Sequence, residues 1–177
     1  MLEKDYKKIF DDLTRRLFPI CRSLTGPGNR KTLDIIKEYL TDLSVIETPT
    51  GTSAFDWVVP KEWIINHATI TDPNGNVIVD FKKSNLHVMS YSRPIQENLT
   101  FEDLKPHLFY YDDDIIPYKT SYYDENWGFC VTKKQFQRME SFKDSNEKFK
   151  VCIDSSFIDG SMTHGELLLK GELKEEY

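Results

Sequence analysis

Hydrophobic residues near the start of the chain recur at the spacing of an amphipathic helix. The apolar stripe runs from Leu2 to Leu17 and predicts an α-helix that ends before Pro19. A second apolar series, Leu33, Ile36 and Leu40, predicts another helix after the loop at residues 25–29. Thr25 or Asn29 is the expected cap of this helix. These two helices account for the segment that precedes residue 44.

From residue 44 onwards the pattern becomes the apolar–polar alternation of β-strands. A strand is predicted at residues 45–48, and a hairpin at 63–81 is centred on Asn74-Gly75, a pair that favours a tight turn. Further strands are expected at 85–91, 127–131, 149–153 and 164–170, and short helices at 100–104 and 132–139. The layout predicts an α+β fold, with two N-terminal helices followed by a mainly antiparallel β module with short helical insertions.

Composition excludes several classes of protein. The 177 residues carry a net charge of −6 with both signs interspersed, so the basic face that nucleic-acid binding requires is absent. The sequence contains neither a run of roughly 20 apolar residues nor an apolar signal segment at its start. Cys21, Cys130 and Cys152 are widely spaced, which indicates free thiols in a reducing compartment and predicts a cytoplasmic location.

The segment from Ile116 to Cys130 is the strongest candidate for a binding surface, because five aromatic residues lie among few charges. Tyr118, Tyr122, Tyr123 and Trp127 could stack on a sugar or hold a peptide. They could equally form a corner of the core in which hydroxyl and indole groups bond to the backbone. The sequence leaves both interpretations open.

The loop from Arg22 to Gly28 is a second candidate. Arg22 lies beside backbone amides at a predicted helix start, where an anion or a carboxylate can be held. The alternative is an arginine that anchors its loop to a neighbouring sheet. In a third segment, Gly51 to Trp63, Trp57 and Trp63 flank Pro60 and are expected to fix a turn between domains.

Patterns for metal binding or nucleophilic catalysis are weak. The four histidines form no metal-binding motif, and His164 and Glu166 only share a face of a predicted strand. The acidic run from Asp112 to Asp114 has no glycine turn and is typical of a solvated loop. Cys130 could act as a nucleophile beside a histidine, but its surroundings favour a buried, inert thiol.

Five blocks of the sequence resemble, in the same order, the N-terminal part of a prokaryotic zinc aminopeptidase-like family that was long catalogued as a domain of unknown function. The blocks contain Trp, Cys and Pro, so chance agreement explains them poorly, and the resemblance covers essentially the whole chain. They are Leu17–Gly26, Phe55–Trp63, Ser84–Ser92, Ile116–Cys130 and Asp159–Glu166.

This resemblance implies a di-zinc exopeptidase-type domain that carries an inserted β-rich module. It assigns residues 1–57 to the opening of the peptidase-like domain, 58–164 to the inserted module and 165–177 to a strand that returns to that domain. In such family members, a Cys-His-Pro-Ser segment and an Asn-rich stretch look like the first metal ligands, and both would follow Tyr177. Consequently no catalytic residue and no metal ligand carries over to this chain, and zinc is implied only for the full-length protein.

The expected function is therefore that of a fragment, inactive alone, which supplies scaffold and substrate enclosure to a peptidase. Arg22, Tyr122, Tyr123 and Trp127 are the expected substrate-binding residues, for a peptide or small-molecule substrate. An exposed edge of the peptidase-like sheet would also allow homo-oligomers to form. Two alternatives stay open: a non-catalytic carbohydrate- or peptide-binding module with an aromatic platform, and a cysteine hydrolase that uses Cys130.

Overall fold

The computed structural model describes residues 2–121 and 124–171 and confirms the α+β class. The chain divides into two compact units, of which the first joins Met1–Glu62 to Asp159–Tyr177 and the second is Trp63–Ile158. The second unit therefore interrupts the sequence of the first. The boundaries expected at 57/58 and 164/165, and the assignment of the flanking parts to a peptidase-like domain, stay predictions.

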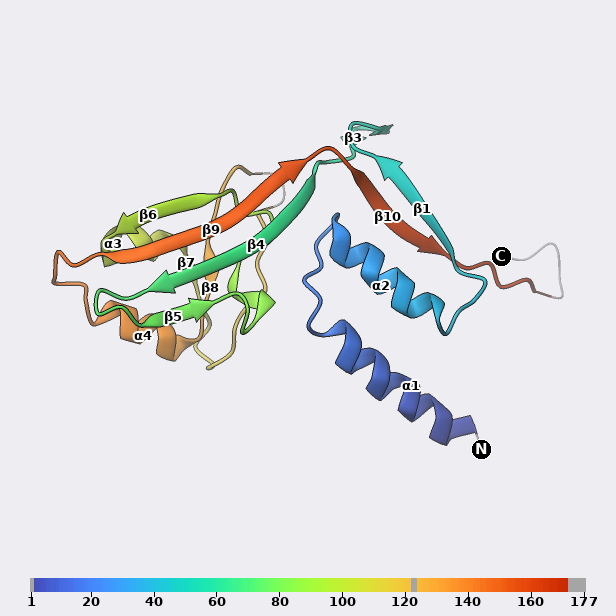
Figure 1. The fold of residues 1–177 in the computed structure, drawn as a ribbon, viewed down its shortest axis with the longest axis horizontal. Coiled ribbons are helices and arrows are strands. Elements are labelled where there is room, and N and C mark those ends of the chain that lie inside the picture. Colours follow the sequence, from blue (N-terminus) through green and yellow to red (C-terminus); the bar gives the residue numbers. More distant parts are fainter. Residues whose placement is uncertain (1, 122–123, 172–177) are drawn as a thin grey trace. The chain divides into compact units, whose positions relative to one another are not determined.

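Two helices and a two-stranded antiparallel sheet make up most of the first unit (Figure 1). The helix α1 (Leu2–Leu17) ends where the sequence predicted, shortly before Pro19. The partner of β1 (Ser44–Pro49) is β10 (Ser161–Glu166), which comes from the far end of the chain, and Ser44 lies opposite Glu166. The last strand was expected at 164–170, so β10 begins and ends earlier than its prediction.

The start of α2 (Pro27–Lys37) differs from the sequence prediction. Neither Thr25 nor Asn29 caps it: the N-cap is Gly26, at φ 106°, and Pro27 occupies the first turn. Such a φ angle suits glycine, and the fixed φ of proline suits the first helical position. The side chain of Asn29 instead donates to the Ser23 carbonyl, over 2.7 Å, and so closes the preceding loop.

The chain passes between the two units twice, after Glu62 and before Asp159. Hydrogen bonds among residues of the first unit hold these two points close together. The Glu62 carboxylate accepts a hydrogen bond from the Ser161 amide, over 2.8 Å. Thr50 adds three bonds: its amide donates to the Gly160 carbonyl, its hydroxyl donates to the Pro60 carbonyl, and the Gly160 amide donates to the same hydroxyl. Beside these bonds lies a small hairpin of β2 (Ser53–Ala54) and β3 (Trp57–Val58).

A four-stranded sheet in the order β5-β4-β9-β6 organises the second unit (Figure 1). The strands are β4 (Glu62–Thr71), β5 (Val77–Asp80), β6 (Ile95–Leu99) and β9 (Phe149–Ile158). The predicted hairpin is confirmed, because β4 and β5 pair in antiparallel fashion around the turn at 72–76. The Asp72 carboxylate accepts from the amides of Asn74 and Asn76, and Gly75 supplies the left-handed residue at φ 86°.

Short elements fill the rest of this unit. Thr100 caps α3 (Phe101–Leu104), and Thr132 forms a capping box with Gln135 at the start of α4 (Lys133–Glu140), where the sequence predicted short helices. The strand expected at 127–131 is shorter than predicted, because β8 spans only Phe129–Cys130. The remaining short elements of this unit are η1 (Asn85–His87), η2 (Lys105–His107) and β7 (Leu108–Phe109).

The strand predicted at 85–91 is wrong. Residues 85–87 form η1, and only isolated bridges, Val88 to Phe129 and Ser90 to Thr120, follow it. Tyr91, at φ 64°, has a left-handed backbone that interrupts a regular strand. Val88, Met89 and Tyr91 are nevertheless buried, which explains why the pattern of this stretch resembled a strand.

Candidate functional site

The aromatic segment at 116–130 contributes its tryptophan to the core of the second unit. The indole of Trp127 is 4% exposed and stacks on His107, with ring centroids 3.7 Å apart. His107 Nδ1 also lies 3.0 Å from the Trp127 carbonyl. In this position Trp127 fixes the end of the segment, and its role in substrate binding stays a prediction. Tyr122 and Tyr123, also predicted to bind substrate, lie outside the described residues.

Ser92 holds this region together, although the sequence patterns gave it no role. Its carbonyl accepts from the indole of Trp63, over 2.9 Å, and from the hydroxyl of Ser155, over 2.8 Å. Its own hydroxyl accepts from the Gly128 amide and donates to the Met89 carbonyl. The only sequence signal was the place of Ser92 at the end of a family block. Trp63 is thus tied into the second unit by a hydrogen bond.

A pocket of about 210 Å³ lies between two arms of one loop in the second unit. The outgoing arm begins with β7, and the returning arm leads towards the bridge at Thr120. The pocket brings Tyr118, from the predicted aromatic platform, together with two tyrosines that the sequence patterns did not single out. Its lining residues are Leu108, Phe109, Tyr110, Tyr111, Pro117, Tyr118 and Lys119.

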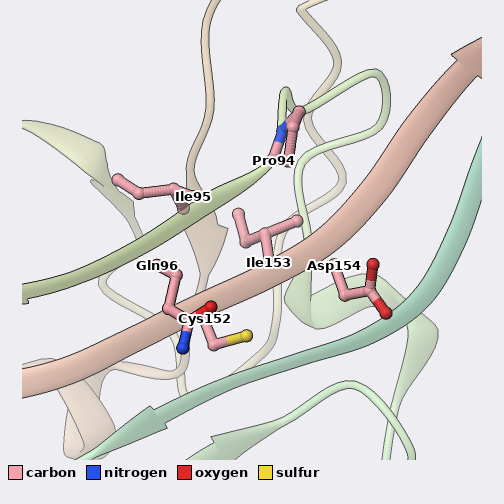
Figure 2. Close-up of a pocket in the computed structure, with 6 residues that line it drawn as sticks. All are labelled: Pro94, Ile95, Gln96, Cys152, Ile153 and Asp154. Carbon is pink, nitrogen blue, oxygen red and sulfur yellow. The ribbon is translucent and has the colours of Figure 1, made fainter.

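A second pocket, of about 290 Å³, lies on β6 and β9 (Figure 2). Gln96 and Cys152 are opposite each other in the strand register, as are Ile95 and Ile153. Asp154 supplies the one charged side chain of the lining. The sequence patterns missed this site because β6 was not predicted. One carboxylate, one amide and a thiol give it little means of fixing a ligand.

Arg22 and Arg30 behave differently. Arg22 is exposed, and its side chain makes no hydrogen bond with the part of the chain that the structure describes. Arg30 forms two hydrogen bonds with the Glu62 carboxylate, over 2.8 and 2.7 Å, and Glu62 is only 3% exposed. The Arg30 guanidinium holds the pKa of Glu62 below its usual value, and this outweighs the opposing effect of burial. The two residues lie 32 positions apart, so no local pattern reveals the pair.

Cys130 lacks the surroundings of a nucleophile. Its side chain is fully buried, and burial raises the pKa of its thiol to about 11. The nearby His87 places Nδ1 2.8 Å from the Cys130 carbonyl oxygen, which is a backbone contact. Burial also lowers the pKa of His87. The arrangement therefore gives no support to a cysteine hydrolase.

The described residues do not fit a zinc site. Across residues 2–121 and 124–171, no group of three or more His, Cys, Asp or Glu side chains is placed to hold a metal ion. His164 and Glu166 do meet, with 3.5 Å between Nε2 and Oε1, but they are only two potential ligands. Asp112 pairs with Lys133 and Asp114 with Lys134, as expected for a solvated loop. The helices of this part of the chain are also too short or too polar to cross a membrane.

Comparison with known proteins supports the resemblance drawn from the sequence. Residues 62–156 match a family model described as "Domain of unknown function (DUF2172)". A Clostridium acetobutylicum protein named "Putative polysaccharide biosynthesis protein with aminopeptidase-like domain" is 48% identical over 167 residues, which are 93% of this chain and 37% of that protein. A crystal structure described as a "putative peptidase" from the same species has a TM-score of 0.83 at 44% identity.

The match to this crystal structure covers 99% of the present chain but 43% of the other. The chain thus spans about two fifths of the length of these relatives. The predicted relation to aminopeptidase-like proteins is confirmed by the names that both relatives carry. Because the family model covers more than half of the residues, the chain belongs to the DUF2172 family.

Proposed function

We propose that this chain is the N-terminal part of a zinc-dependent aminopeptidase-like protein, supplies scaffold and substrate enclosure, and is inactive alone. The observation that carries the proposal is the match along 99% of the chain to a structure described as a "putative peptidase", of which it covers only 43%. Hydrolysis by a zinc peptidase needs metal to acidify water and a base to accept the proton. The cluster of side chains for this task would lie in the part of the longer protein that the chain does not contain.

Arg22, Tyr122, Tyr123 and Trp127 are the proposed contributors to enclosure of a peptide or small-molecule substrate. The exposed guanidinium of Arg22 is available for a carboxylate or another anion. Trp127, which is buried, would act by fixing the segment that carries the two tyrosines. In this proposal the chain orients and shields the substrate, and the reacting groups come from elsewhere in the protein.

Parallel assays of this chain and of the longer protein test the proposal. We expect the longer protein to contain zinc by mass spectrometry and to release p-nitroaniline from leucine p-nitroanilide, whereas the 177-residue chain does neither. Stoichiometric zinc and hydrolysis with the 177-residue chain would contradict the assignment to scaffold. A longer protein without zinc or peptidase activity would contradict the assignment to a zinc peptidase.

Substitutions in the longer protein test enclosure separately. We expect Arg22→Gln and Tyr122→Ala each to lower kcat/KM about tenfold, a loss of about 1.4 kcal/mol of transition-state stabilisation. The matched control is Arg15→Gln, because Arg15 is an exposed arginine whose ion pair with Asp11 lies within α1. Unchanged kcat/KM in the first two variants would remove these residues from the substrate-binding role.

A further inference from the structure

The pocket between residues 108–111 and 117–119 gathers three tyrosines that still present much of their surface to solvent. Tyr110 is 39%, Tyr111 56% and Tyr118 61% exposed, and all three line the same cavity. We propose that this pocket binds a single pyranose ring of a neutral saccharide. The inference rests on the pocket alone and is independent of the peptidase-like function proposed above.

The walls of the pocket are already fixed. The outgoing arm is held by the Val131 amide, which donates to the Phe109 carbonyl over 2.9 Å. The returning arm is held by the Ser90 amide, which donates to the Lys119 carbonyl, also over 2.9 Å. The ring of Tyr110 stacks on Phe136 with centroids 4.1 Å apart. A ligand therefore meets prearranged walls, which lowers the ordering cost of binding.

The size of the cavity suits one ring. Its volume of about 210 Å³ is below that of pockets for drug-sized ligands, which begin at roughly 300 Å³. A pyranose has an apolar face of C–H bonds and a rim of hydroxyl groups. Tyrosine matches both features, because its ring offers an apolar face and its hydroxyl both donates and accepts hydrogen bonds.

The polar groups at the pocket are also available. Within residues 2–121 and 124–171, the hydroxyls of Tyr110, Tyr111 and Tyr118 have no hydrogen-bond partner in the protein. The Lys119 ammonium lies 4.8 Å from the centre of the Phe109 ring and adds a donor for a sugar oxygen. Together these groups can fix the orientation of a hydroxyl-rich ring.

A peptide or a nucleic acid fits the pocket less well. Binding by strand addition needs free backbone groups, but the carbonyls of Phe109 and Lys119 already accept hydrogen bonds. A phosphate backbone would meet the carboxylates of Asp112, Asp113 and Asp114, which follow the outgoing arm directly. A neutral sugar avoids both difficulties.

Titration of the 177-residue chain with maltose, cellobiose and N,N′-diacetylchitobiose, followed by ¹H–¹⁵N NMR, tests the proposal. We expect at least one disaccharide to bind at millimolar concentration and to shift amide signals within residues 108–119. Tyr111→Ala and Tyr118→Ala should each weaken binding about tenfold, since each removes a stacking surface. Tyr111→Phe, which keeps the ring, should weaken it by a smaller factor of about three.

Tyr6→Ala is the matched control, because Tyr6 is 58% exposed but lies on α1, in the first unit. Its dissociation constant should equal that of the unchanged chain. The proposal is overturned if none of the three disaccharides binds, if the shifted signals lie outside the loop, or if both alanine variants bind as well as the unchanged chain. It is also overturned if a proline-rich peptide shifts the same signals at lower concentration than any of the sugars.

Discussion

The two units of the chain treat their apolar side chains differently. Among the described residues, all twelve of the largest fully buried side chains belong to the second unit, including Phe101, Phe129 and Phe149. In the first unit the structure leaves large apolar side chains in solvent: Phe10 is 71%, Phe18 74% and Leu169 82% exposed. The second unit therefore has a core of its own, whereas the described part of the first unit has only a small one.

Polar interactions supplement the small core of the first unit. Arg16 pairs with both Asp12 and Glu38 on its surface, and exposed pairs of this kind contribute little. The pair of Arg30 with the buried Glu62 is different, because loss of Arg30 leaves the buried Glu62 carboxylate without its charged partner. Stability of the first unit should therefore depend on a few identifiable contacts.

Expression of each unit alone should show the largest difference between them. We expect residues 63–158, expressed alone, to show dispersed NMR signals and cooperative unfolding, because all of their fully buried side chains are retained. Residues 1–62 alone should be largely unfolded, since β1 loses its partner β10. A dispersed spectrum from residues 1–62, or a collapsed one from 63–158, would contradict the comparison.

Truncation of a core ring should give the next largest effect. Phe149 is fully buried and packs edge-to-face against Phe142, so Phe149→Ala should lower the free energy of unfolding of the second unit by about 3–5 kcal/mol. Phe10→Ala, in the exposed face of α1, should change stability by no more than about 0.5 kcal/mol. Urea denaturation followed by circular dichroism measures both, and similar losses in the two variants would erase the distinction between the units.

Loss of the ion pair between Arg30 and Glu62 should lower the stability of the first unit moderately. Arg30→Ala should destabilise it by about 1–2 kcal/mol, less than for an enclosed pair because the Arg30 side chain is 36% exposed. Arg15→Ala, which removes an exposed pair with Asp11, should have no measurable effect. Hydrogen exchange of β1 and β10 amides reports on this unit directly, and equal exchange in the two variants would argue against a structural role for Glu62.

Lowering the pH should have the smallest effect on stability, and it should act on the two units over different pH ranges. Burial lowers the pKa of His87 below 6.5, so its neutral form is favoured in the folded state and stability of the second unit falls as pH drops below 6.5. The Arg30 contact lowers the pKa of Glu62 below 4.5, so its contribution is complete above pH 4.5 and is lost as pH falls further. His87→Gln should flatten the pH dependence of the second unit between pH 6.5 and 5, as measured by urea midpoints. If the urea midpoint of His87→Gln falls with pH as steeply as that of the unchanged chain, His87 is not the source of this pH dependence.

Local signals made part of the fold predictable. The Asn-Gly pair specified the hairpin of β4 and β5, and Thr100 marked the start of α3. The strand β6 was missed because Ile95–Leu99 lies at the edge of the sheet, where three of its five residues are polar and exposed. The predicted strand at 85–91 failed for the opposite reason: Val88, Met89 and Tyr91 are buried, but hydrogen bonds to distant segments hold this stretch in irregular structure.

The candidate site was less predictable, because it depends on contacts between distant positions. Composition singled out Trp127, but it could not show that His107 covers the indole ring. Tyr118 was named as part of an aromatic platform, whereas the pocket also needs Tyr110 and Tyr111 from the other arm of the loop. Arg22 was noticed through its place in a motif, while Arg30 was passed over because its partner is 32 positions away.

The hydrogen bonds of Glu62 and Thr50 have an evolutionary consequence. Since Glu62 Oε1 lies 2.8 Å from the Ser161 amide, residues 63–158 leave the rest of the chain and rejoin it at practically the same point. A unit whose two ends lie this close together can be gained, lost or exchanged for another while β1 keeps its pairing with β10. A short turn that joins Glu62 to Asp159 should then close the gap and leave this pairing in place.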